Sequence, residues 1–192
     1  MKIYLASKSP RRQELLKQMG IEFELIDGEI NEHWNGEEQP RNYVKRLALE
    51  KARVGFNSLE PGNDERLVIA ADTSVVLDNT ILGKAVTPEH AASMLRELSG
   101  RRHEVYSAVA IVKGDRQLVK TSISHVSFKP LSVNEIVSYC ETNEPLGKAG
   151  GYAIQGRAAI FIERLEGSYS GVMGLPIFET STLLNQFFRQ NP

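Results

Sequence analysis

The chain has few of the residues and patterns that several protein classes require. It contains a single cysteine, Cys140, so an intramolecular disulfide and a cysteine-rich zinc site are excluded, and the apolar helical pattern around it indicates a packed core thiol. Its 23 Lys and Arg residues are balanced by 24 Asp and Glu residues. The chain therefore lacks the positive field with which proteins bind nucleic acids or membrane surfaces non-specifically, and any anion site must be local.

Long apolar runs and common hydrolase motifs are also missing. Met1 and Lys2 precede only a short apolar run, which is too short for a signal peptide or a membrane-spanning helix, so we expect a cytoplasmic protein. The histidines lack the HExxH spacing of zinc hydrolases, and Ser168 lies outside a GxSxG motif. The glycine-rich segment 147–156, GKAGGYAIQG, is neither a Walker A loop nor a GxGxxG fingerprint. The sequence motifs therefore give no support for a zinc hydrolase or a serine hydrolase.

The apolar pattern predicts a mixed α/β fold. The run 67–71, LVIAA, is continuously apolar and of strand length, which is typical of a strand covered on both faces, and it ends at Asp72. A hairpin over 74–82 is expected to turn at Asp78 and Asn79. Capping signals and apolar spacing place the other elements. We expect helices over 10–20, 41–56, 88–99, 133–142 and 176–188, and strands over 1–6, 21–26, 103–113, 117–128 and 158–165.

Length and composition fit one compact unit. The chain has 192 residues, of which 41% are apolar and 24% charged, as is ordinary for a globular protein with a sizeable core. We expect a mixed twisted sheet flanked by helices, in two lobes with a central cleft.

The segment 5–16, LASKSPRRQELL, places two arginines where helix formation alone would not. Ser9, followed by proline, is a strong helix start, which puts Arg11 and Arg12 in the first turn. The helix macrodipole is already positive at that end, so cations there are mildly unfavourable. Together with free backbone N–H groups and hydroxyls such as that of Ser7, they predict an anion site suited to phosphate. The alternative is a pair of solvated arginines on a surface helix.

Asp72 is the first candidate for catalysis. A carboxylate that follows a buried strand lies at the carboxyl edge of an α/β sheet, where ligands of such sheets bind. There it can hold a divalent metal or act as a general base; the alternative is a turn aspartate that caps the next segment. Thr73 beside it supplies a hydroxyl with the same ambiguity.

Three further charged residues are weaker candidates. Glu32 stands among other acids in a loop, where a solvated surface is the common alternative. Lys51 lies next to the apolar face of the helix 41–56, and it either points into a cleft or extends over apolar neighbours to solvent. Lys84 follows a glycine in a loop and has the same two interpretations.

The glycine-rich segment 147–156 suits a close approach of the backbone to a flat or charged group. Gln155 within it offers an amide donor and acceptor together, as recognition of an imide-like base edge requires. The alternatives are an elaborate loop before the strand 158–165 and a polar residue at the end of a strand.

Taken together, these segments resemble the Maf family of nucleoside triphosphate pyrophosphatases over nearly the whole chain. Seven pieces in order are far more specific than any single motif. They are LASKSPRRQELL (5–16), Glu32 in its acidic loop, RLALEKA (46–52), ADT (71–73), GK (83–84), KAGGYAIQG (148–156) and GLP (174–176). The resemblance implies a single domain over 1–192.

The resemblance also implies roles for the candidate residues. Asp72, Lys51 and Lys84 would be catalytic, and Asp72 and Glu32 would hold Mg²⁺ or Mn²⁺. The implied substrate-binding residues are Ser7, Arg11, Arg12, Thr73 and Gln155. Arg11 stands where a 7-methylguanosine-selective subgroup carries tryptophan, whereas Thr73 and Gln155 match a subgroup similar to dTTP/UTP pyrophosphatases. The sequence leaves open which arginine carries more of the phosphate charge.

The expected activity is hydrolysis of the α–β phosphoanhydride bond of dTTP or UTP to the monophosphate and pyrophosphate, a house-cleaning role. CTP and modified pyrimidine nucleotides stay open as substrates, because pocket shape decides among them. The alternative is a non-catalytic, nucleotide-binding regulator of septum formation, against which the retained catalytic positions argue. The expected partner is a small-molecule nucleotide, not a nucleic acid or a membrane. A homodimer is implied by the resemblance alone.

Overall fold

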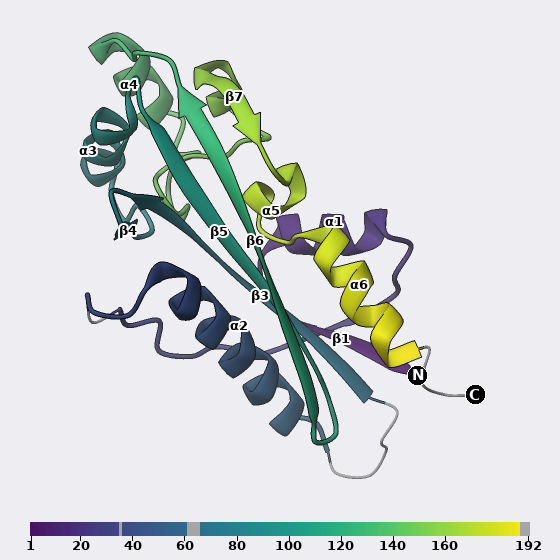
Figure 1. The fold of residues 1–192 in the computed structure, drawn as a ribbon. Helices are drawn as coiled ribbons and strands as arrows, with labels where there is room; N and C mark the ends of the chain where they lie inside the picture. The colour runs from purple at the N-terminus through teal and green to yellow at the C-terminus, as the bar shows by residue number, and fades with distance from the viewer. Residues whose placement is uncertain (35, 61–65, 189–192) are drawn as a thin grey trace.

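A computed structural model of the protein describes residues 1–34, 36–60 and 66–188, and it shows one twisted sheet with helices on both faces (Figure 1). The seven-stranded sheet has the order β2-β1-β3-β5-β6-β7, and β4 pairs with β3. The pairs β1–β2 and β1–β3 are parallel and the others antiparallel, so the mixed α/β prediction is confirmed. The strands are β1 (Lys2–Ala6), β2 (Glu24–Ile26), β3 (Arg66–Leu77), β4 (Thr80–Leu82), β5 (Arg102–Lys113), β6 (Arg116–Phe128) and β7 (Ile162–Glu166).

The helices begin close to the predicted start signals. Thr87 caps α3 by accepting a hydrogen bond from the His90 amide at 3.1 Å, and Ser132 and Glu135 form the expected capping box of α4. The helices are α1 (Pro10–Gln18), α2 (Pro40–Asn57), α3 (Pro88–Leu98), α4 (Val133–Cys140), α5 (Tyr169–Met173) and α6 (Ile177–Phe188), with a 3₁₀ helix η1 (Arg157–Phe161). In the described part of the chain, none of these helices has the length and apolar character needed to span a membrane.

The prediction that a strand ends at Asp72 is wrong. β3 continues to Leu77 because its antiparallel pairing with β5 runs from Val68 to Val76, past Asp72. What ends here is the parallel neighbour β1, whose last pairing with β3 joins Leu5 and Ile69. Asp72 therefore lies inside a long strand but beyond the carboxyl end of β1, which still places it at a ligand-binding edge. The hairpin turn is as predicted, with positive φ at Asp78 and Asn79.

Two other predicted strands are corrected. The segment 158–165 begins in η1, where the three-residue repeat of a 3₁₀ helix buries Ala158 and Phe161 on one side, and only Ile162–Glu166 is a strand. The strand predicted over 21–26 is confined to β2. The helix α5 had no sequence prediction, because it is only five residues long.

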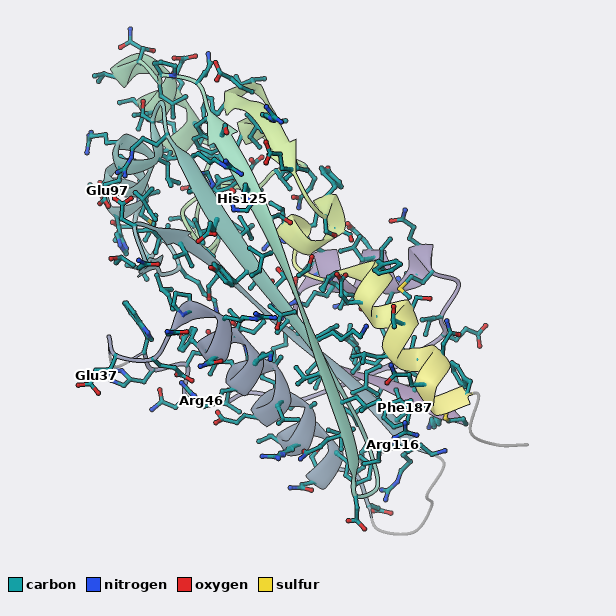
Figure 2. The ribbon with its side chains drawn as sticks, viewed as in Figure 1. Glu37, Arg46, Glu97, Arg116, His125 and Phe187 are labelled. Carbon is teal, nitrogen blue, oxygen red and sulfur yellow. The ribbon has the colours of Figure 1, made fainter. Side chains whose placement is uncertain are left out.

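The core has three parts, which pack helices against the sheet in different places. One cluster lies under α3 and α4 and includes the buried thiol of Cys140, as predicted. The other two pack α2 against one face of β1, β3 and β5, and α1 and α6 against the other (Figure 1). At the far end of that sheet the Arg116 guanidinium lies 4.6 Å from the ring centroid of Phe187 in α6 (Figure 2). Asp72, in the middle of β3, lies between these packed regions.

Candidate active site

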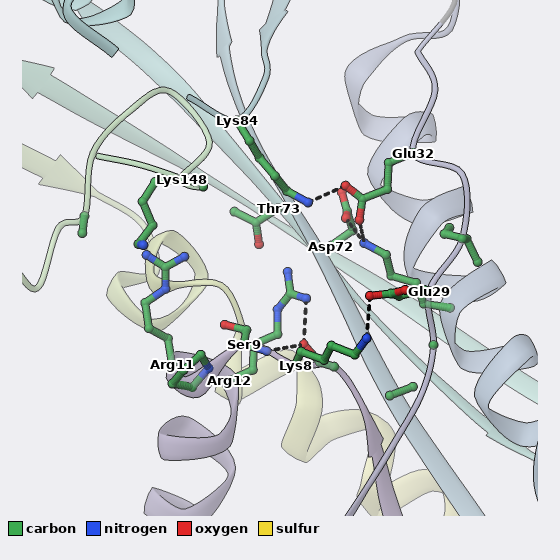
Figure 3. Close-up of a pocket in the computed structure, with 18 of the residues that line it drawn as sticks. Lys8, Ser9, Arg11, Arg12, Glu29, Glu32, Asp72, Thr73, Lys84 and Lys148 are labelled. Carbon is green, nitrogen blue, oxygen red and sulfur yellow. Dashed lines mark hydrogen bonds and ion pairs between the residues drawn. The ribbon is translucent and has the colours of Figure 1, made fainter. Parts of the chain in front are cut away.

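All nine predicted site residues line one cavity of about 540 Å³ (Figure 3). The cavity lies beyond the carboxyl end of β1, bounded by the start of α1, by α2 and by the glycine-rich segment 147–156. The nine residues are Ser7, Arg11, Arg12, Glu32, Lys51, Asp72, Thr73, Lys84 and Gln155. Residues that are more than a hundred positions apart in the sequence therefore face the same space.

Four charged side chains form a chain of ion pairs on one wall of this cavity (Figure 3). The Lys51 ammonium lies 2.6 Å from Asp72 Oδ1 and 2.6 Å from Glu32 Oε1, and Lys84 Nζ lies 2.5 Å from Glu32 Oε2. Burial by itself would raise the pKa of Glu32, but hydrogen bonds and charges from the two lysines outweigh it and lower that pKa to about 2. Glu32 is therefore ionised at neutral pH.

Lys51 is a buried residue of α2 and not a solvated one. It follows Tyr43 and Leu47 at four-residue spacing on the buried face of the helix, and only 7% of its surface is exposed. A buried ammonium requires a paired negative charge, which Asp72 and Glu32 supply. The alternative of a lysine extending to solvent is wrong.

Asp72 and Thr73 are adjacent in β3, so their side chains leave opposite faces of the sheet. Asp72 is 5% exposed and faces Lys51 of α2, whereas Thr73 faces the side of Gly174. Within the described chain, Asp72 Oδ2 has no hydrogen-bond partner. That oxygen is available to a water molecule or a cation in the cavity.

Arg12 is fixed in place by groups from both ends of the chain. Its Nε donates to the Gly174 carbonyl at 2.9 Å and its terminal nitrogen donates to Ser7 Oγ at 3.2 Å. Burial lowers the pKa of Arg12, and the charges of Asp72 and Glu32 counteract that shift. The arginine is a preorganised cation at the start of α1, so the solvated-surface alternative is wrong for it.

Arg11 has a different neighbour. Its guanidinium lies beside the ammonium of Lys148, from the glycine-rich segment (Figure 3). Burial and the charge of Arg12 lower the pKa of Arg11, and burial and Arg11 lower the pKa of Lys148. Among the described residues, neither cation forms an ion pair with a carboxylate. Two cations so placed favour a negatively charged or oxygen-rich ligand.

The glycine-rich segment packs against the loop that carries Lys84. The Ala85 amide donates to the Lys148 carbonyl at 3.1 Å, and the Gly150 amide donates to the Gly83 carbonyl at 3.1 Å. Gly150 has φ +65°, and a Cβ there would lie 2.9 Å from the side chain of Val75. The segment thereby brings Lys84, Lys148 and the exposed Gln155 to the same cavity.

Three residues at or next to the cavity were not predicted from the sequence. Lys148 lies within the segment that carried the resemblance, and a cation among glycines was an available signal for it. Glu144 lines the cavity and accepts hydrogen bonds from the Tyr139 hydroxyl and the Arg157 amide, at 2.9 and 3.1 Å. Ser107 in β5 is buried behind Thr73, 2.9 Å from its hydroxyl. No sequence pattern distinguishes Ser107, because only the register of β3 and β5 brings the two together.

The donors present suit a hard divalent cation that shares its ligands with a substrate. No cluster of three or more metal-ligating side chains exists among the described residues. Mg²⁺ is commonly bound through one or two carboxylates together with substrate phosphates, and Asp72 and Glu32 present two carboxylates to one cavity. The residues therefore fit such an ion.

The comparison with known families decides the relationship. The family model described as Maf-like protein matches residues 2–187. The chain belongs to the Maf family. Its similarity to individual Maf proteins is also extensive. It is 52% identical to a protein of Alkalilimnicola ehrlichii named dTTP/UTP pyrophosphatase, over 96% of this chain and 92% of that protein.

Two further relatives carry the same name. One from Aromatoleum aromaticum is 48% identical, over 97% of this chain and 95% of the relative. One from Xanthomonas axonopodis pv. citri is 46% identical, over 96% of this chain and 98% of the relative. These relatives cover 96–97% of the chain, and the family model spans residues 2–187, so the cavity residues lie within the family match.

Proposed function

We propose that this protein hydrolyses the α–β phosphoanhydride bond of dTTP and UTP, giving the nucleoside monophosphate and pyrophosphate, in a house-cleaning role. The observation that carries the proposal is the convergence of Lys51, Lys84, Arg11 and Arg12 on one cavity that also holds the buried carboxylate of Asp72. Four cations supply the charge that a triphosphate needs. The names of the Maf relatives support the same activity.

The cations do most of the catalytic work in this proposal. Arg12 and the amino-terminal end of α1 hold phosphate oxygens, as helix amino termini commonly do. Lys51 and Lys84 neutralise charge that develops on the non-bridging oxygens and on the departing pyrophosphate. Because Lys51 and Arg12 are already held by ion pairs and hydrogen bonds, these two cations need little reorganisation during the reaction.

Asp72 activates the nucleophile. A water molecule at Oδ2 is oriented toward the α-phosphorus, the new P–O bond forms as the bond to the bridging oxygen breaks, and Asp72 accepts the proton of the water. Lys51 stays at Oδ1 and holds the carboxylate in position. The electron pair of the broken bond stays on the bridging oxygen and leaves with pyrophosphate, while the α-phosphate remains on the nucleoside monophosphate.

We also propose that Asp72 and Glu32 hold a Mg²⁺ or Mn²⁺ ion together with the substrate. When bound, this ion supplies charge neutralisation at the phosphates and lowers the pKa of bound water. Thr73 and Gln155 face the imide edge of the pyrimidine base. We further propose a homodimer located in the cytoplasm, with neither nucleic acid nor membrane as a partner.

The experiment is a pyrophosphate-release assay with dTTP, UTP, CTP and purine triphosphates, in the presence of Mg²⁺ or Mn²⁺. Release is expected from dTTP and UTP, and Asp72→Asn should abolish it while the thermal unfolding midpoint shows an intact fold. Full activity of that variant contradicts the assignment of Asp72. Release from none of the nucleotides would instead favour a nucleotide-binding regulator, the second candidate.

A further inference from the structure

Behind the cavity, three groups from three elements form a relay of hydrogen bonds. The Ser107 hydroxyl of β5 donates to the Gly171 carbonyl of α5 at 2.5 Å. The hydroxyl oxygens of Ser107 and Thr73 lie 2.9 Å apart. Thr73 Oγ1 also lies 3.4 Å from the Gly174 carbonyl. Ser107 is 1% exposed, so no solvent competes for its hydrogen bonds.

This arrangement fixes the direction of the Thr73 hydroxyl. A hydroxyl has one proton to donate and two lone pairs that accept. Ser107 donates its proton to the Gly171 carbonyl, so in the contact between the two hydroxyls Thr73 is the donor and Ser107 the acceptor. The other contact of Thr73 is with a carbonyl, which also only accepts. Neither Ser107 nor Gly174 belongs to the lining of the cavity, so in both contacts the Thr73 proton is directed at a group outside that lining.

Thr73 nevertheless lines the cavity, so what it presents there is a lone pair. We propose that Ser107 acts as a positioning residue that holds Thr73 as an acceptor and thereby makes the site select bases with a donor at N3. This inference rests on the proposed function, in which Thr73 faces the imide edge of the base.

The base chemistry makes the selection specific. Uracil and thymine carry an N3–H donor between two carbonyl oxygens, whereas N3 of cytosine is an acceptor. A fixed acceptor at Thr73 accepts a hydrogen bond from N3–H of uracil or thymine. With cytosine it faces the lone pair of N3, and two acceptors repel each other. A site built to bind a hydrogen-bond donor rejects analogues that lack it, because its own polar group is then left unpaired. Ser107 thus explains why UTP and dTTP would be preferred to CTP.

The test compares Ser107→Ala with wild type. Without Ser107 the Thr73 proton has only the longer contact to Gly174, so the hydroxyl can turn and donate to N3 of cytosine. We expect the ratio of kcat/KM for UTP over CTP to fall about tenfold, the effect of one hydrogen bond. The preference for UTP over 3-methyluridine triphosphate, which lacks the N3–H group, should fall similarly.

The matched control is Ser124→Ala. Ser124 is a buried serine of the neighbouring strand β6 whose hydroxyl donates to the Ser168 carbonyl at 3.3 Å, and it does not line the cavity. This variant should keep both ratios within twofold of wild type. Ser107→Cys, which keeps the side chain in place but bonds weakly, should behave like Ser107→Ala and provides a second variant if the alanine protein does not fold. Unchanged ratios in a folded Ser107 variant, or an equal fall in the control, overturn the inference.

A binding measurement separates this inference from the proposed hydrolysis. Dissociation constants for UTP and CTP are measured by calorimetry on Asp72→Asn and on Asp72→Asn with Ser107→Ala, so that neither nucleotide is consumed. If UTP is preferred and the preference is lost in the variant, the relay holds even when no pyrophosphate is released, and only the hydrolysis fails. If pyrophosphate is released from UTP but neither ratio depends on Ser107, the relay is wrong and the hydrolysis stands.

Discussion

The Lys51 ammonium and the Asp72 carboxylate lie 2.6 Å apart, and both side chains are buried. Glu32 completes the arrangement on the other side of the ammonium, also at 2.6 Å. One buried cation is thus shared by two carboxylates, and Glu32 is also paired with Lys84. Any substitution that removes the lysine leaves these carboxylates without their shared countercharge.

Lys51→Met should therefore lower kcat at least about a hundredfold, which is the usual effect of removing one preorganised charge donor from a reaction centre. The pKa of Glu32 should rise from about 2, because the hydrogen bond from Lys51 is among the causes that lower it. Steady-state pyrophosphate release and an NMR titration of the glutamate carboxyl measure the two effects. Arg53→Met, an exposed cation on the same helix, is the matched control and should retain activity. Equal activity of the two variants would rule out a catalytic role for Lys51.

Much of this site could be predicted from sequence because its residues stand in local patterns. The first turn of α1 marked Arg11 and Arg12 as candidates by electrostatics, with a solvated pair as the alternative, and the apolar run before Asp72 indicated the sheet edge. Although β3 does not end at Asp72 as predicted, Asp72 still lies at the carboxyl end of a strand, because the neighbouring strand β1 ends there. Such local patterns mark the ends of helices and strands, and ligands commonly bind there.

What sequence could not provide depends on long-range pairing. The relation of Ser107 to Thr73 follows from the antiparallel register of β3 and β5, in which the two residues are direct partners. The choice between a buried and a solvated Lys51 depended on how α2 rotates against the sheet. Neither relationship can be predicted from composition or from the spacing of residues. The same holds for Arg12, whose partner Gly174 lies 162 positions away.

His103 offers a test of stability against pH that is independent of the active site. Its ring is 2% exposed, Nε2 lies 2.8 Å from the Tyr152 hydroxyl, and Nδ1 has no partner among the described residues. Burial lowers the pKa of His103 from 6.5 to about 4. Between these two values the unfolded chain binds a proton at this residue and the folded protein does not. Stability therefore falls as pH falls from about 6.5 to about 4, by up to about 1.4 kcal/mol per pH unit.

The variant His103→Gln should lose this part of the pH dependence. As pH decreases from about 6.5 to about 4, the variant should become progressively more stable relative to wild type, so the difference in their free energies of unfolding should grow. Urea unfolding at a series of pH values measures the difference. His90→Gln, which changes an exposed histidine on α3, is the control and should keep the wild-type slope. If the slope persists in His103→Gln, the buried ring is not its source.

The neighbouring cations Arg11 and Lys148 predict opposite effects on stability and on substrate binding. They repel each other, since the charge of Arg11 lowers the pKa of Lys148, and no described carboxylate forms an ion pair with either. Lys148→Met keeps the apolar stem and removes the charge, so the free energy of unfolding should increase by a few tenths of a kcal/mol to about 1 kcal/mol. The KM for UTP should rise about tenfold, because an oxygen-rich ligand relieves the repulsion in wild type. Thermal unfolding and steady-state kinetics at two salt concentrations measure both effects, and added salt should reduce the gain in stability.

The matched control is Lys17→Met, which removes an exposed cation from the last turn of α1. The helix dipole favours a cation there, so this variant should be slightly less stable than wild type and have an unchanged KM. A Lys148→Met protein that is less stable than wild type and binds UTP equally well would show that the lysine serves the fold and not the nucleotide.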